Sequence, residues 1–187
     1  MSAMSEKLDA IKSRLKLPVI SAPMFLVSGV DLVIACCKAG IMGSMPVTNA
    51  RTIEDLKAVF EKISTELTDA DAPYAMNMIT HSSYQRLDQE LELIQEYKPQ
   101  IVITALGSPG RVTEQVHSYG GLVFADANSP DFARKAVEKG ADGLVLVCNG
   151  AGGHTGMISP FAFVDEVRSF FDGPIALAGA MSNGTAI

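Results

Sequence analysis

Short apolar runs alternate with amphipathic segments along the whole chain. The runs are rich in Val, Ile, Leu, Met and Ala, and their starts lie about 20 to 35 residues apart, the size of a βα unit. Continuous apolar runs are typical of strands that are buried on both faces, as in a parallel sheet. The predicted strands are 19–22, 41–45, 74–78, 101–105, 122–125, 144–147 and 175–178.

Helix signals fill the segments between these strands. Thr52 precedes apolar residues that recur with a period near 3.6, which indicates an amphipathic helix. Serine–proline pairs at 108–109, 129–130 and 159–160 place a capping hydroxyl before a proline at the first helical position. Residues 1–16 mix charged residues with apolar ones at helical spacing, so we expect an N-terminal helix there.

Polar and glycine residues follow almost every predicted strand. In a TIM (β/α)₈ barrel all the βα loops meet at one mouth, whereas a doubly wound sheet concentrates ligand residues at its switch point. The distribution therefore favours an α/β fold of the barrel type. Because such barrels typically need ~250 residues and an eighth strand, we expect residues 17–187 to form a barrel domain truncated after its seventh strand, without the eighth βα unit.

A barrel that stops at its seventh strand leaves two strands with unpaired edges. Unpaired N–H and C=O groups beside an apolar face favour association with another chain. We therefore expect the isolated chain to be marginally stable, to aggregate or to form a homo-oligomer, with Val19, Ile20 and residues 175–177 most affected.

Composition excludes several classes of function. The net charge of −6 and the pI near 5.0 argue against nucleic acid, which requires clustered Lys and Arg. No apolar stretch reaches the ~20 residues of a membrane span, and residues 1–16 lack the apolar core of a signal peptide. Three cysteines, two of them adjacent, do not suggest a disulfide framework, and no cluster has metal-ligand spacing. These features predict a cytoplasmic protein without a metal or a membrane partner.

A glycine-rich loop with a single histidine follows the run 143–147. The loop, residues 150–156, reads Gly-Ala-Gly-Gly-His-Thr-Gly. Glycines let a backbone approach a flat or phosphorylated ligand closely, and histidine titrates near neutral pH, which suits proton transfer. The combination predicts a cofactor loop with His154 as a catalytic base.

These landmarks resemble the flavin-dependent nitronate monooxygenases, formerly called 2-nitropropane dioxygenases. The resemblance covers the chain from about Leu17 onward and rests chiefly on the Ala-Gly-Gly-His-Thr-Gly string at 151–156. Further landmarks are Pro-Val-Ile-Ser-Ala-Pro-Met at 18–24, residues 39–44, Asn77 and Ala-Gly-Ala at 178–180.

The resemblance implies a barrel that binds FMN noncovalently. It implies a flavin loop at 179–184, with Ala180 where many relatives carry a second glycine, and it implies that a second phosphate loop follows the eighth strand. Taken alone, Asn77 is explained as well by a hydrogen bond within the sheet, Asp126 by the start of a loop, and Cys148 by packing. The implied catalytic residue is His154, and the implied flavin contacts are Ala22, Pro23, Met24, Asn77, Asp126, Gly152, Gly153, Gly179 and Ala180.

The activity implied by the resemblance is oxidation of nitroalkanes or alkyl nitronates with O₂ to carbonyl compounds and nitrite. Two alternatives with the same fold and histidine loop stay open, namely an NAD(P)H:quinone reductase and an enoyl-thioester reductase. A truncated, inactive fragment is an alternative of another class.

Overall fold

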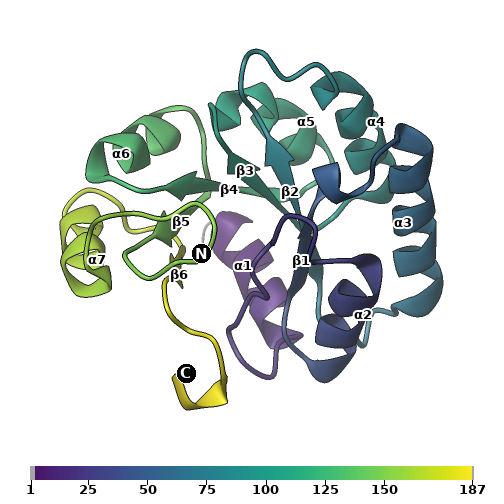
Figure 1. Cartoon of the computed structure of the whole chain (residues 1–187), viewed down its shortest axis with the longest axis horizontal. Coiled ribbons are helices and arrows are strands. Elements are labelled where there is room, and N and C mark those ends of the chain that lie inside the picture. Colours follow the sequence, from purple (N-terminus) through teal and green to yellow (C-terminus); the bar gives the residue numbers. More distant parts are fainter. Residues whose placement is uncertain (1–2, 187) are drawn as a thin grey trace.

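The sheet of this protein is parallel throughout and follows the order of the chain. The computed structural model describes residues 3–186, and its six strands are ordered β1 to β6, each paired with the next (Figure 1). The chain-order parallel pairing and the helix between each pair of successive strands confirm the predicted α/β barrel architecture. The strands are β1 (Gly43–Pro46), β2 (Tyr74–Ile79), β3 (Ile101–Ala105), β4 (Leu122–Ala127), β5 (Gly143–Val147) and β6 (Ile175–Ala178).

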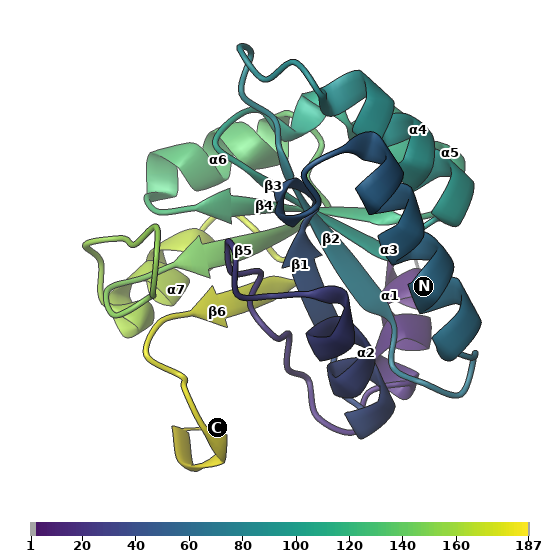
Figure 2. The ribbon, with the colours of Figure 1, turned by 45° about the vertical axis from the view of Figure 1, so that its right-hand side comes forward.

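The two faces of the sheet are covered differently. Six helices line its outer face in an arc, whereas α1 (Ala3–Ser13), the expected N-terminal helix, lies inside the curve (Figures 1 and 2). The outer helices are α2 (Val30–Ala39), α3 (Ile53–Glu66), α4 (Leu87–Tyr97), α5 (Thr113–Ser118), α6 (Pro130–Glu138) and α7 (Pro160–Arg168).

The hydrophobic core divides along the same lines. On the inner face, Ile11 of α1 packs with Met42, Ile101 and Phe124. On the outer face, one cluster gathers around Phe60 and Met76 and a second around Phe163 and Leu146. Side chains of alternate strand residues point to opposite faces, so each strand contributes to both sides. The sheet is therefore buried on both faces, as its continuous apolar runs predicted.

The prediction of a strand at 19–22 was wrong, because these residues form no ladder. They form only an isolated parallel bridge between Ile20 and Met42, with Met42 N donating to Val19 O over 3.0 Å and Ser21 N to Met42 O over 2.8 Å. Pro18 and Pro23 flank the bridge and have no N–H group to donate. The chain therefore follows the path of a barrel strand here without forming a full ladder.

The helix caps agree with the sequence in part. Thr52 and Asp55 form a capping box at α3, and the Ser129 hydroxyl accepts from Phe132 N at α6. The Ser159 side chain makes no cap hydrogen bond at α7. Ser108 caps a short 3₁₀ helix, Pro109–Arg111, which precedes α5. The serine–proline pairs thus mark starts of helical structure, although only one caps an α-helix as expected.

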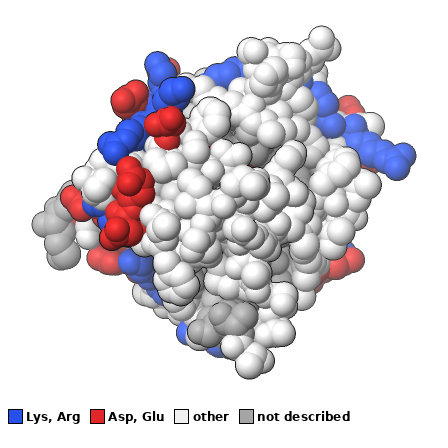
Figure 3. Space-filling view, turned by 60° about the vertical axis from the view of Figure 1, so that its left-hand side comes forward, with Lys and Arg blue, Asp and Glu red and all other residues white. Residues whose placement is uncertain are grey.

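The outer edge of β6 is open in the described structure. Its residues are partly exposed, and Leu177 is 38% exposed. Figure 3 brings this side of the molecule forward, and its charged side chains gather at the margins of a broad uncharged area. Met157, in the loop after β5, and Phe161 of α7 are further exposed apolar residues. The surface beside β6 therefore has the apolar character expected of an incompletely covered strand.

Two phenylalanines of α7 test the packing of the outer face. Phe163 is fully buried, whereas Phe161, two residues earlier, is 88% exposed. Phe163→Ala should lower the free energy of unfolding by about 3–5 kcal/mol, because it leaves a cavity as well as losing apolar burial. Phe161→Ala should change it by less than about 0.5 kcal/mol. Urea unfolding followed by circular dichroism measures both, and equal effects would contradict the packing described here.

Candidate functional site

The loops that follow the strands gather at one end of the sheet. Because all strands are parallel, their carboxyl ends lie on the same rim. Figure 2 shows the arrowheads of β4, β5 and β6 pointing to the same side. The predicted site residues lie on or just inside this rim. They lie in three places: an early loop at 22–28, two inner-face positions on β2 and β4, and the loops after β5 and β6.

The early loop is held in a defined shape by two polar side chains. The Ser28 hydroxyl accepts from Met24 N over 3.0 Å and donates to Ala22 O over 3.2 Å. The Asn49 amide bonds to the backbone of the same loop at three points. The loop presents the apolar side chains of Met24 and Phe25, which are 40% and 65% exposed. Sequence reasoning missed both Ser28 and Asn49.

The glycine loop after β5 exposes His154. The imidazole makes no hydrogen bond within residues 3–186 and lies at the surface. A Cβ built at Gly152 or Gly153 would have no heavy atom within 4 Å, so both glycines border open space. Gly153 also has a positive φ of 70°, which favours glycine. This stretch of backbone therefore borders open space, and its role as a cofactor loop stays a prediction.

The base of the same loop is tightly packed. A Cβ at Gly156 would lie 2.1 Å from the Val147 carbonyl oxygen, so this position accepts only glycine without rearrangement. Thr155 Oγ1 donates to Cys148 O over 3.2 Å. Cys148 is fully buried, and burial raises the pKa of its thiol, which disfavours the reactive thiolate. Packing therefore explains Cys148, whereas the free part of the loop is confined to the segment around His154.

A backbone hydrogen bond joins the loops after β5 and β6. Ala180 N donates to Gly150 O over 2.9 Å. A Cβ at Gly150 would lie 3.1 Å from the Ala180 side chain, which is tight. Ala180 itself has a φ of 56°, a conformation that usually favours glycine, so the alanine at this position is strained. Gly179 and Ala180 are thus brought directly against the histidine loop.

Asn77 and Asp126 share the inner face of the sheet. Asn77 pairs with Ile103, and Asp126 with Val145, both of which belong to the inner-face packing. Asn77 Nδ2 donates to Ile103 O over 3.1 Å. This is the hydrogen bond within the sheet that the sequence offered as one explanation of Asn77. The Oδ1 atom of Asn77 has no partner within residues 3–186. Burial raises the pKa of Asp126 to about 7. Both residues therefore present polar atoms to the inside of the curve.

A set of arginines ties neighbouring rim loops together. Arg86 donates to Ala50 O and Arg51 O over 3.1 Å each, and Arg111 donates to Thr80 O and His81 O. Arginines that bond backbone carbonyls have no local sequence signature, so sequence reasoning missed them. The loops of the rim are consequently braced by their neighbours.

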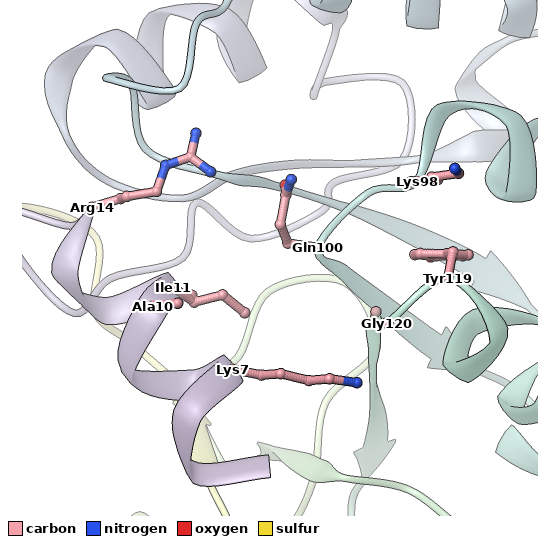
Figure 4. A pocket seen from close by; sticks show the side chains of 9 residues that line it. Lys7, Ala10, Ile11, Arg14, Lys98, Gln100, Tyr119 and Gly120 are labelled. Carbon is pink, nitrogen blue, oxygen red and sulfur yellow. The ribbon is translucent and has the colours of Figure 1, made fainter. Parts of the chain in front are cut away.

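One hollow of the described structure lies away from the rim. A cavity of about 270 Å³ opens between α1 and the amino ends of β3 and β4 (Figure 4). It is lined by Lys7, Ala10, Ile11, Arg14, Lys98, Gln100, Tyr119, Gly120 and Gly121. Nearby, His117 Nε2 lies 2.7 Å from Asp142 Oδ2. Because ligand sites of barrels lie at the carboxyl ends of the strands, this cavity is separate from the candidate site.

Comparison with known proteins identifies the family. The model of the nitronate monooxygenase family matches residues 55–187. The chain belongs to the nitronate monooxygenase family. A nitronate monooxygenase of Neurospora crassa is 27% identical over 211 residues, which cover 90% of this chain and 54% of the relative. The (3aS,4S,5R,7aS)-5-hydroxy-7a-methyl-1-oxo-octahydro-1H-indene-4-carboxyl-CoA dehydrogenase of Rhodococcus jostii is 24% identical over 170 residues, covering 91% and 46%.

Solved structures of this architecture support the fold. FabK from Thermotoga maritima superposes with a TM-score of 0.81 at 22% identity and covers 97% of this chain and 56% of its own. At this identity the likeness shows the fold alone. The chain spans about half the length of the curated relatives that it matches. The predicted TIM-type barrel, present here as a curled part of the sheet, is confirmed.

The described residues carry neither a membrane-spanning helix nor a metal cluster. No helix in this part of the chain is long and apolar enough to cross a membrane. The same residues contain no group of three or more His, Cys, Asp or Glu side chains placed to hold a metal ion.

The raised pKa of Asp126 on β4 predicts that the stability of the protein depends on pH. Because burial raises the folded-state pKa of Asp126 from 3.8 to about 7, the folded chain binds the proton more tightly than the unfolded chain. Stability should therefore fall as the pH rises between these values. Asp126→Asn should be more stable than the parent at pH 8, and the difference should shrink toward pH 4. Urea unfolding across this range measures the effect.

Asp71 provides a control of opposite sign. Hydrogen bonds from the Thr68 backbone and hydroxyl lower the pKa of Asp71, so its stabilisation is present at neutral pH and is lost as the pH falls. Asp71→Asn should accordingly destabilise the protein at pH 7 and lose its effect in acid.

The Asp126 prediction has a direct check by NMR. A carboxyl carbon of Asp126 that titrates near pH 4 would contradict it, because it would show that this carboxyl group is well solvated.

Proposed function

We propose that this chain carries the flavin-binding rim of an FMN-dependent nitronate monooxygenase. The observation that supports this most directly is the glycine loop after β5, which combines open backbone at Gly152 and Gly153 with an exposed, unpartnered His154. The family assignment supports an oxidoreductase of this type. The substrates would be alkyl nitronates or nitroalkanes together with O₂, and the products carbonyl compounds and nitrite.

The residues of the rim fit a flavin. The open glycines leave room for a flat ring to approach the backbone, and the early loop offers Ala22, Pro23 and the exposed Met24 side chain. Asn77 Oδ1 and Asp126 face the inside of the curve. Gly179 and Ala180, joined to Gly150, would support the phosphate end. These residues would hold FMN noncovalently, and the bound flavin would supply the electron transfer.

The chemistry left to the chain is proton transfer and positioning. A nitroalkane carries an acidic C–H beside its nitro group, and an imidazole nitrogen of His154 would take that proton or orient a nitronate already formed. The early loop would provide apolar walls through Met24 and Phe25. Burial raises the pKa of Asp126 to about 7. Below that pH its neutral carboxylic acid would donate a hydrogen bond without repelling an anionic nitronate.

A second candidate is a flavin-dependent reductase of an enoyl thioester or a quinone. The Rhodococcus jostii relative is named as a dehydrogenase of a carboxyl-CoA compound, and it is 24% identical to this chain. Its name supports a thioester substrate as the alternative. The same rim and histidine loop would serve that reaction. Reduction of the bound flavin by NADH in the absence of nitronate distinguishes it from the monooxygenase.

The cofactor proposal is tested by reconstitution. We expect the purified chain to bind FMN, to quench its fluorescence and to release it unchanged on denaturation. Gly153→Val should weaken binding at least about tenfold, because a branched side chain resists the left-handed backbone and fills the open side of the loop. Gly110→Ala, at a remote glycine with ordinary contacts, is the control. A chain that cannot be loaded with FMN contradicts the proposal.

The role of His154 is tested by comparing two substrate forms. His154→Ala should leave FMN content nearly intact but slow turnover of the neutral nitroalkane by about 10²–10⁴-fold, the usual contribution of a positioned base. Turnover of the preformed nitronate should fall much less, since its proton is already gone. His81→Ala, in a different rim loop where His81 contacts Ser83, is the control. Equal losses on both substrates would show that His154 orients the substrate without acting as a base.

A further inference from the structure

The amide of Asn49 is bound at three points to one loop. Asn49 ends a short 3₁₀ helix, Val47–Asn49, that follows β1 directly. Its Oδ1 accepts from Leu26 N over 2.9 Å, and its Nδ2 donates to Met24 O over 3.0 Å and to Ser28 O over 2.7 Å. One side chain from the rim thus ties the beginning, the middle and the end of the early loop.

These bonds hold a backbone that would not keep this shape by itself. Leu26 has a φ of 60°, which is uncommon for a residue with a branched side chain and persists only where its surroundings impose it. Its N–H is the group that Asn49 accepts. Leu26 and Val27 are 73% and 67% exposed, so apolar packing does not impose the conformation. The constraints in the described structure are therefore hydrogen bonds, from Asn49, from the Ser28 hydroxyl and within the turn at Met24 O. Of these, only the bonds of Asn49 tie the loop to another part of the rim.

The shape of the loop decides which backbone groups stay available. Met24 N is taken by Ser28 and Met24 O by Asn49, Val27 and Ser28, while Ala22 O accepts from Ser28. Pro23 has no N–H. Ala22 N has no partner within residues 3–186 and remains free for a ligand. Release of the clamp would allow the loop to satisfy itself differently and to cover this group.

The clamp is itself anchored to the body of the fold. Arg86 bonds the carbonyls of Ala50 and Arg51, the two residues that follow Asn49. Its guanidinium lies 3.3 Å from Glu90 Oε1, and Tyr84 donates to the same oxygen over 2.6 Å. The Glu90 side chain is fully buried on α4. The position of Asn49 is therefore fixed from both sides, by β1 and by the Arg86–Glu90 pair.

We propose that Asn49 is a positioning residue that holds the 22–28 loop in the shape required to receive the flavin before the flavin arrives. The inference rests on the proposed function for the identity of the ligand. It assigns to Asn49 an effect on cofactor affinity that acts through the loop, since the amide is occupied by the backbone and not by the ligand.

The variant Asn49→Asp tests this with almost no change in size. A carboxylate can still accept from Leu26 N, but it places an oxygen against the carbonyls of Met24 and Ser28, at the 3.0 and 2.7 Å positions where the amide now donates. Asn49→Ala removes all three bonds without this repulsion. Thr52→Ala is the matched control, because it destroys the α3 capping box in the same connection and leaves the bonds of the early loop intact.

Two measurements on the full chain separate positioning from a merely structural role. Without flavin, chymotrypsin should cut after Phe25 or Leu26 at least about tenfold faster in Asn49→Asp than in the parent, since the loop opens locally. With flavin, fluorescence titration should show FMN affinity weakened about ten- to a hundredfold, the range for residues that support a binding group. Thr52→Ala should melt at a lower temperature, but its loop cleavage and FMN affinity should match the parent.

The outcomes are distinguishable. Cleavage in Asn49→Asp that equals that of the parent overturns the clamp, and faster cleavage with unchanged FMN affinity overturns its role toward the cofactor. An equal loss of affinity in Thr52→Ala would reduce Asn49 to a contributor to stability and would also overturn the inference. A parent chain that binds no FMN overturns the proposed function, and the cleavage result then still decides whether the clamp exists.

Discussion

Parallel backbone pairing between successive strands is the constraint on which the rest of this structure depends. Each strand from β1 to β6 bonds to the next one in the chain, so every connection crosses the outer face as a helix and every loop after a strand opens on the same rim. The register then sets which residues share a layer. Asn77 lies opposite Pro46 on one side and Ile103 on the other, and Asp126 lies opposite Val145. Two polar residues that are remote in sequence thus come to face one interior.

The two faces of the sheet differ in polarity and in what packs against them. The outer face is apolar and packs against six helices, which accounts for the buried positions of Phe60, Met76 and Phe163. The inner face is apolar near the amino ends of the strands, where Ile11 of α1 seals it, and becomes polar toward the rim. This gradient places the polar groups of the candidate site toward the rim, above a largely apolar inner face. Burial there raises the pKa of Asp126 to about 7.

The rim loops lack the ladder that stabilises the strands, and side chains replace it. Asn49 holds the early loop, Arg86 holds the segment after Asn49, and Arg111 holds the loop after β2. Each donor bonds the backbone of a neighbouring loop, so the brace runs from one connection to the next around the mouth. The histidine loop differs, because its base is fixed by packing at Gly156 while its tip stays open. The braced loops would hold a fixed shape toward a bound cofactor, and the open segment around His154 leaves its imidazole accessible for proton transfer, as the proposed function requires.

The sequence by itself determined the order and type of the elements, the parallel sheet and the histidine loop, because strand runs, helix periodicity and glycine spacing are local signals. Tertiary structure alone decided that residues 19–22 form a bridge and no ladder, since prolines on both sides act only when a partner strand is present. It also decided the clamp of Asn49 and the anchor of Arg86 on Glu90. Those contacts join residues more than twenty positions apart or depend on burial, and neither distance in space nor exclusion of water is encoded in any short window of the chain.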